Sequence, residues 1–240
     1  MRMISSEHAK VKHTPFWILH ICLPAIGALL FVLYYLLYQS TADIKKLKLI
    51  LEVTATFFPL LISIMVSINV SLDEKASRFQ ALLAVPNRAK TIVGKLLYLY
   101  GAGIAALVFL FLVFTIGIHV FGLVRSVDFS LLRESVLGIA WCNLIIYMLH
   151  LFLSLKSGFG FSVFWGVFEC LQCILYSNIE LKSAARYIPF AWSMAWIQDI
   201  LNDRLSVYQT EWISFSVMTV AGFVLLLLWF SHWEGRKNGE

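Results

Sequence analysis

A single carboxylate, Glu169, stands in the middle of an apolar run that is long enough to cross a membrane. A carboxylate in a bilayer is costly, and it normally faces the interior of a helix bundle or a water-filled cavity. Glu169 could contact a cationic substrate or a neighbouring subunit. It could equally be protonated, or be hydrogen-bonded to Gln172 or Asn143 as a structural contact. His150 and His119 lie near the ends of apolar runs, where packing is the more common role.

The motifs of membrane enzymes are absent from the sequence. There is no H-E-x-x-H zinc motif and no G-x-S-x-G nucleophile elbow, and Glu169 lacks the second glutamate and the histidine motifs of intramembrane glutamate proteases. Gly94 and Lys95 lack the upstream glycine and the following Ser or Thr of a phosphate-binding loop. Cys170 and Cys173 form a C-x-x-C inside FECLQCIL, where apolar packing is favoured over redox or metal chemistry. We therefore expect no catalytic residues, no metal and no cofactor in this chain.

Composition places these residues in a membrane protein. The 240 residues are 60% hydrophobic and 14% charged, whereas soluble domains are about 25% charged. The charges are clustered, which leaves several uncharged stretches of about 20 residues, the length that crosses a bilayer. We predict an all-α polytopic membrane protein with a single transmembrane domain over residues 1–240. The net charge of +5 lies in loops, so it indicates orientation in the lipid bilayer rather than nucleic-acid binding.

Six apolar runs predict six membrane spans, which places both termini on the same side. A basic segment at residues 1–14 is expected to form a short helix on the inner face, and the first apolar run is expected to be a retained span rather than a cleaved signal. Lys and Arg are more numerous on the side of the termini, which favours cytoplasmic termini. The spans are expected at about 15–38, 49–70, 96–119, 135–155, 159–176 and 212–230.

The segment 71–95 is the longest charged stretch between two apolar runs. Ser71 and Glu74 have the spacing of a capping box, which predicts the start of a short helix, and Pro86 would end that helix. An apolar stripe on such a helix fits either lipid headgroups or a groove on a soluble partner. The predicted apolar face holds Phe79, Leu82 and Leu83, and the opposite face holds Lys75 and Arg78.

Residues 177–211 are polar and aromatic, and Pro189 can start a short helix within them. This segment is too short and too polar to span, so we expect it to lie at the outer membrane interface or to dip into it. Trp192 and Trp196 are expected to be belt residues at that interface. The apolar stripe of the helix would consist of Phe190, Met194, Ile197 and Leu201.

The whole chain resembles ABC-2-type permeases, in which six spans follow a basic N-terminal helix and the loop between spans two and three is a cytoplasmic coupling helix. Three blocks are similar to the permease subunits of lantibiotic-immunity ABC transporters, and more closely to the G-type subunit of systems with two permeases and one ATPase. These blocks are HTPFWILHICLPAIGALLFVLYY, EKASRFQALLAVPNRAKTIVGKL and WFSHWEGRK.

The resemblance implies a permease subunit, not an enzyme, in the bacterial plasma membrane. It implies a heterodimer with a second homologous permease, and two copies of a separate ABC ATPase that binds the ATP. The complex would expel a cationic lantibiotic peptide from the membrane. The element that couples to the ATPase would contain Glu74, Arg78, Phe79, Leu82, Leu83 and Pro86.

An external gate and a substrate path are also implied by the resemblance. Residues 181–203 would form the gate, where exposed acids could meet a cationic peptide. Two alternatives stay open: an ABC-2 permease for another cargo, such as a drug, a peptide or a lipid-linked molecule, or a non-transporting membrane scaffold or sensor. The residues expected on the path or at the gate are Glu169, Trp192, Trp196, Asp199 and Asp203.

Overall fold

The computed structural model describes residues 2–12, 14–38, 43–124, 127–178, 187–202 and 209–236, and these contain helices but no strand. Six of the helices are long and apolar enough to cross a membrane, so the prediction of a multi-pass, all-α membrane protein is confirmed at this level. In chain order the elements are α1 (Arg2–Val11), α2 (Pro15–Leu37), α3 (Asp43–Ser77), α4 (Gln80–Leu83), α5 (Arg88–Val120), α6 (Phe129–Ser157), α7 (Phe159–Asn178), η1 (Pro189–Ala191), α9 (Trp192–Leu201) and α10 (Gln209–His232).

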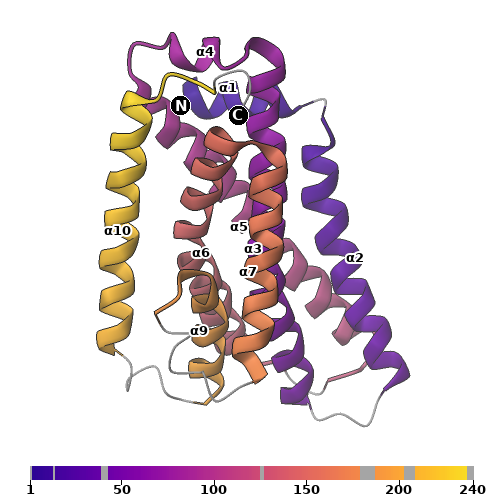
Figure 1. Cartoon of the computed structure of the whole chain (residues 1–240). Helices are drawn as coiled ribbons and strands as arrows, with labels where there is room; N and C mark the ends of the chain where they lie inside the picture. The colour runs from indigo at the N-terminus through magenta and orange to yellow at the C-terminus, as the bar shows by residue number, and fades with distance from the viewer. Residues whose placement is uncertain are drawn as a thin grey trace.

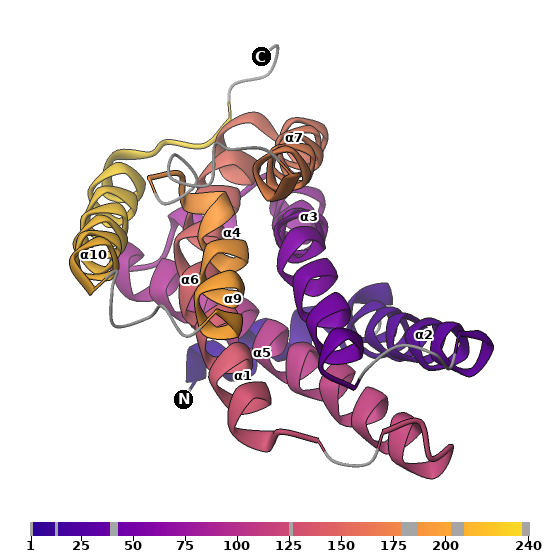
Figure 2. The same cartoon turned by 90° about the horizontal axis from the view of Figure 1, so that it is seen from below.

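The six long helices run side by side, and the short elements lie at the two ends of the bundle (Figure 1). Helices α1 and α4 and both chain termini share one end, as the even number of spans requires. Helix α9 lies toward the other end, and the view from that end shows it near the centre of the bundle, beside α6 (Figure 2). Helix α2 packs mainly against α5, and α7 packs against α3.

Several spans are longer than their apolar runs. Helix α3 continues to Ser77, and α5 already begins at Arg88, where the Asn87 side chain accepts a hydrogen bond from the Lys90 backbone N–H at 2.9 Å. Helix α6 begins at Phe129, before the fourth span expected at about 135–155. Hydropathy marks only the part of each helix that lies in hydrocarbon, whereas the helix itself ends where its backbone is capped.

Glycine allows a sharp turn at one position of the bundle and a close helix contact at another. Gly158 makes the tight turn between α6 and α7 with a φ of 94°, a conformation that favours glycine. In α5, Gly103 permits a close approach of α6, because an added Cβ would lie 1.7 Å from the Tyr147 hydroxyl. Gly101 makes no such contact, because an added Cβ would meet nothing within 4 Å.

Candidate functional site

The loop between α3 and α5, residues 78–87, differs from the helix predicted there. The capping box is wrong, because Ser71 lies inside α3 and its hydroxyl donates to the Ile68 carbonyl at 2.8 Å. Helix α3 instead ends at a sharp turn where Arg78 and Phe79 have positive φ values of 47° and 66°. The left-handed region costs a non-glycine residue about 1–2 kcal/mol, so the rest of the loop must stabilise this turn. Helix α4 is one turn long and ends at Leu83, before Pro86.

The apolar face of the loop points into the protein. Phe79 is only 2% exposed, and Leu82 is buried as well. The Phe79 ring lies 5.2 Å from the Trp233 ring, and the Arg236 guanidinium lies 5.4 Å from the Phe79 ring centroid. The C-terminal segment, residues 233–236, therefore covers the stripe that the sequence offers for docking on a partner. A partner that approached the loop in this conformation would meet its other face.

The C-terminal segment contacts the loop through Phe79 and is hydrogen-bonded to three long helices, α3, α5 and α6. Arg236 Nη1 lies 2.5 Å from Glu74 Oε1, and Arg236 Nη2 donates to the Ser154 carbonyl of α6 at 2.8 Å. Arg88, the first residue of α5, donates to the Trp233 carbonyl at 3.0 Å. Residues from α3, α5, α6 and the chain terminus are thus joined around the loop.

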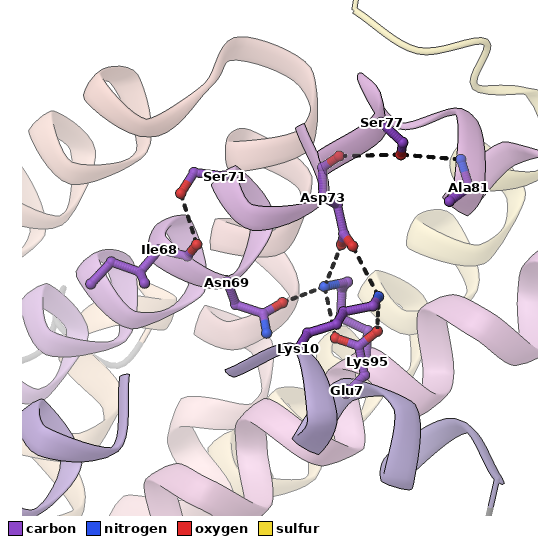
Figure 3. Close-up of polar contacts among 9 residues, drawn as sticks. All are labelled: Glu7, Lys10, Ile68, Asn69, Ser71, Asp73, Ser77, Ala81 and Lys95. Carbon is purple, nitrogen blue, oxygen red and sulfur yellow. Dashed lines mark hydrogen bonds and ion pairs between the residues drawn. The ribbon is translucent and has the colours of Figure 1, made fainter. Parts of the chain in front are cut away.

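A charged cluster of Glu7, Lys10, Asn69, Asp73 and Lys95 lies beneath the loop and joins α1, α3 and α5 (Figure 3). Lys95 is fully buried, its ammonium lies 3.0 Å from Glu7 and 2.7 Å from Asp73, and it donates to Asn69 Oδ1. Lys10 lies 2.5 Å from Glu7 and 2.9 Å from Asp73. Two cations and two carboxylates alternate, so the cluster is neutral, which burial of charge requires.

From the sequence, Lys95 was weighed only as part of a phosphate-binding loop and as the end of the charged segment 71–95, and its burial was not predicted. A signal was present, because Lys95 lies on the helical face of Ile92 and Leu99, both of which are buried. A lysine on an apolar helix face implies a buried acidic partner. The sequence does not say which of the acids supplies it.

The pKa of the Lys10 ammonium is changed by its acidic neighbours in the charged cluster, Glu7 and Asp73. Burial on its own would lower the pKa of Lys10, but the hydrogen bond to Glu7 and the charges of Asp73 and Glu7 raise the pKa above its ordinary value of 10.5. A pKa that is raised on folding gives stability that is complete below the unfolded pKa and is lost as the pH rises through the folded pKa. We therefore expect the melting temperature in detergent to fall as the pH rises above about 10.5.

A Lys10→Met variant provides the comparison for this alkaline transition. It should melt at a lower temperature than the parent at neutral pH, and the difference should shrink at alkaline pH, because the parent then loses the same interaction. An equal difference at both pH values would exclude a contribution from Lys10 titration.

Glu169 is paired inside the bundle. Its Oε2 lies 3.0 Å from His150 Nε2, and both side chains are fully buried. Neither of the expected partners contacts it by hydrogen bond: Asn143 donates instead to Ser193 Oγ at 2.6 Å and to the Ile139 carbonyl. The structure thus supports the interpretation of Glu169 as a structural contact, with His150 as a partner that the sequence did not identify. Among the described residues, no group of three or more His, Cys, Asp or Glu side chains is placed to hold a metal ion.

Helix α9 packs into the bundle, against α3 and α6, rather than lying flat at its surface. Trp192 is 1% exposed, with its ring 4.3 Å from that of Phe215, so its prediction as a belt residue is wrong. Asp199 is 2% exposed, which contradicts its expected role as an exposed acid; Asp203 lies outside the described residues. Trp196 is half-buried and donates to the Glu134 carbonyl of α6 at 3.2 Å.

Because Gly138 of α6 has no side chain, it leaves room for the Trp196 indole. A Cβ at this residue would lie 1.7 Å from Trp196 Nε1, and the indole cannot move away without leaving its bond to Glu134. Gly138→Ala should therefore lower the free energy of unfolding by about 1–3 kcal/mol through overpacking. Gly101→Ala is the matched control, because it brings the same gain in helix propensity with no atom within 4 Å. Equal melting temperatures for the two variants would contradict the packing of α9 on α6.

Comparisons of the chain with protein-family models, with characterised proteins and with solved structures gave no match. A functional interpretation therefore rests on the geometry of the bundle and on the resemblance of the three sequence blocks. The end of the bundle that carries the loop, the charged cluster and the C-terminal segment is joined by ion pairs and hydrogen bonds between α1, α3, α5 and α6.

Proposed function

We propose that this chain is the membrane-spanning permease subunit of an ATP-driven ABC exporter, which expels a lantibiotic-type antimicrobial peptide from the bacterial plasma membrane for self-protection. A separate ATPase, present in two copies, binds and hydrolyses the ATP, and a second homologous permease completes the transporter. Six spans, with the α3–α5 loop and both termini at one end of the bundle, are the arrangement that such a subunit needs.

The observation that carries the proposal is the attachment of the loop. A coupling element must transmit a push from a soluble partner to the spans, so it must not move independently of them. The ion pairs of Lys95 join the end of α3 to α1 and α5, and Arg236 joins Glu74 to α6. Together these contacts tie the end of α3, where the loop begins, to α1, α5 and α6. A force on α4 therefore reaches several spans together.

The outward face of the loop is basic. Lys75 and Arg78 are exposed, as are small or polar side chains around them. An ATPase that docks on this face would present acidic residues, because complementary charge guides association and fixes the register. In this version of the coupling element, Arg78 contacts the partner, whereas Phe79, Leu82 and Leu83 hold the loop to the bundle. The exposed set is Lys75, Ala76, Arg78, Gln80, Ala81, Ala84, Pro86, Asn87, Ala89 and Lys90.

Reversing charge on this face should release the ATPase. The double variant Lys75→Glu with Arg78→Glu would place like charges across the interface, which costs several kcal/mol, so recovery of the ATPase with the tagged chain should fall by more than about tenfold. Lys12→Glu is the matched control, since Lys12 is an exposed lysine beside α1 at the same end of the bundle. Normal ATPase recovery with the double variant would contradict docking on the basic face.

The function itself is tested by purification followed by challenge. The tagged chain, extracted from its native host in mild detergent, should carry with it a P-loop ATPase and a second six-span permease. Transfer of all three genes to a susceptible bacterium should raise resistance to a lantibiotic, and a hydrolysis-deficient ATPase should abolish the gain. Recovery of the ATPase without lantibiotic resistance would favour another cargo, such as a drug or a lipid-linked molecule. Recovery without any ATPase would favour a scaffold or sensor.

A further inference from the structure

A narrow cavity lies between α2, α3 and α5, and one side chain of α6 completes its wall. Its volume is about 180 Å³. The lining extends from Leu19 to Phe31 on α2 and from Val53 to Met65 on α3, which is about 18 Å along each helix at the usual rise per residue. A volume of this size, spread over such a length, has room for one unbranched alkyl chain but not for a fused-ring molecule.

The cavity reaches the surface of the bundle that faces lipid. Phe57 of α3 lines it and is exposed, and α2 packs mainly against α5 rather than α3, so the wall is open between α2 and α3. All three helices are long and apolar enough to cross a membrane. Molecules dissolved in the bilayer are therefore the ones that meet this opening.

Three polar side chains interrupt the apolar lining, namely His20, Thr54 and Tyr147. His20 is 6% exposed and Tyr147 is 3% exposed. Within the part of the chain that the structure describes, neither His20 Nε2 nor the Tyr147 hydroxyl has a hydrogen-bond partner. Burial of a polar group without a partner is costly, so both groups indicate that a ligand supplies the missing hydrogen bonds.

The tautomer of His20 defines which kind of partner is missing. Nδ1 lies 2.8 Å from the Phe16 carbonyl oxygen. Since a carbonyl oxygen only accepts, Nδ1 carries the hydrogen, and in the neutral imidazole Nε2 keeps a lone pair. No acidic side chain among the described residues of the lining could balance an imidazolium. The partner of Nε2 is therefore a donor, such as a hydroxyl group.

The two unpartnered groups lie at the same height in the bundle. Helices α2 and α5 both begin at the end that carries the loop (Figure 1), and an added Cβ at Gly27 would lie 4.0 Å from Leu110. Seven residues earlier on the two helices stand His20 and Gly103. The Tyr147 hydroxyl packs directly against Gly103. The polar groups thus lie together toward the loop end of the cavity, and the apolar lining continues from them as far as Leu110.

From this arrangement we infer that the cavity binds a neutral, single-chain amphiphile from the bilayer, an unbranched alkyl chain that carries a hydroxyl group. The ligand hydroxyl donates to His20 Nε2 and accepts from the Tyr147 O–H, and the chain lies along α3. Apolar cavities of about 150 Å³ stay free of water and take up small hydrocarbons, so the walls favour the chain. No Asp, Glu, Lys or Arg stands among the described lining residues to select a charged headgroup.

The site belongs to a single chain and needs neither an ATPase nor a lantibiotic. It therefore stands or falls separately from the proposed function. Binding of the amphiphile in nanodiscs that hold this chain alone would support the inference even if no ATPase proved to dock on the loop.

The test is photolabelling of the full-length protein in phosphatidylcholine nanodiscs. The probes are dodecanol and dodecane, each with a diazirine at the same carbon, and the adducts are mapped by mass spectrometry. We expect dodecanol adducts on lining residues such as Leu23 and Phe57, and excess unlabelled dodecanol should remove them. Absence of such competed labelling in the cavity would mean that water or another protein segment fills it, and it would overturn the inference.

A variant that fills the cavity provides the control for position. Ala106 of α5 lines the cavity, whereas the neighbouring Ala105 is exposed. Ala106→Phe should abolish the competed labelling, because the added ring occupies the space of the chain. Ala105→Phe adds the same ring to the lipid-facing surface of the same helix and should leave the labelling intact. Competed labelling that survives Ala106→Phe would place the ligand elsewhere and overturn the inference.

Recognition of the hydroxyl group is measured by the ratio of the two probes. Dodecanol should label the parent protein about three- to tenfold more than dodecane, the factor that a hydrogen bond contributes. His20→Phe should bring that ratio close to one while dodecane labelling continues. Tyr147→Phe keeps the ring against Gly103 and should also lower the ratio, which keeps the test available if His20→Phe does not fold. A ratio near one in the parent protein, or one unchanged by these substitutions, would overturn the inference.

Discussion

Lys95→Met should lower the free energy of unfolding by about 3 kcal/mol or more, because removal of one partner from a buried ionic cluster leaves uncompensated charge behind. Methionine matches the length of lysine, so the expected loss comes from charge rather than volume. After the substitution, Lys10 is the one cation among the described residues that is ion-paired with Glu7 and Asp73, and both acids stay buried. The melting temperature in detergent, measured at neutral pH, gives the result.

Lys90→Met is the matched control, since Lys90 lies on the same helix but is exposed. It should change stability little, as surface substitutions usually do. Adding Asp73→Asn to Lys95→Met should restore part of the lost stability, because the variant then has one buried acid fewer. If Lys95→Met melted within the range of the Lys90 control, the charged cluster would not hold α1, α3 and α5 together.

Phe79→Ala should lower the free energy of unfolding by about 3–5 kcal/mol, as expected for removal of a buried phenylalanine. The ring is 2% exposed and contacts Trp233 and Arg236 of the C-terminal segment. Phe79→Asp should cost more, because it also buries a charge. Leu97→Ala is the comparison on α5, where 52% of the side chain is exposed. Thermal unfolding of the three variants in one detergent measures the order of their melting temperatures, which we expect to be lowest for Phe79→Asp and highest for Leu97→Ala.

The partner of the Phe79 ring can be tested with a double-mutant cycle. Trp233→Ala removes the facing ring, so the effects of Phe79→Ala and Trp233→Ala should not add. Strict additivity would mean that the C-terminal segment does not cover the loop. Such an outcome would return the apolar stripe to the role of a docking face for a soluble partner.

The spans were predictable because their signal is local. An apolar run of about 20 residues has few stable alternatives to a transmembrane helix, whatever surrounds it. The tight turn at Gly158 was predictable for the same reason, since a glycine beside polar residues between two apolar runs permits the left-handed conformation. The true helix ends were harder to predict, because α3 continues through Ser71 to Ser77, and α6 already begins at Phe129, where the Asp128 side chain caps it.

The packing of the C-terminal segment on the loop could not be predicted, because it depends on contacts between residues far apart in the chain. The spacing of Phe79 and Leu82 shows that one face of the loop is apolar, but it does not say whether another protein or this chain covers that face. The cover, Trp233, lies at the far end of the sequence. The burial of Asp199 was not predictable for the same reason, because nothing in the local sequence indicates that α9 packs into the bundle.

The pairing of Glu169 with His150 was partly predictable from the sequence. In an antiparallel hairpin, residues at similar distances from the turn lie at the same height, and His150 and Glu169 flank Gly158 in this way within about one helical turn. Their pairing was therefore accessible from the sequence once the turn had been placed. Height alone did not exclude the expected partner Asn143, which is offset from Glu169 by about one helical turn in the other direction; the structure shows that it donates to Ser193 instead.

The measurement that tests the coupling element most directly is site-specific photo-crosslinking in intact cells of the native host. A photoreactive residue at Ala81, which is exposed on α4, should capture a P-loop ATPase, identified by mass spectrometry. The same residue at Asn202, exposed beside α9 at the other end of the bundle, should capture none. Capture of the ATPase from Asn202, or of no ATPase from Ala81, would contradict the proposal that the α3–α5 loop is the docking element.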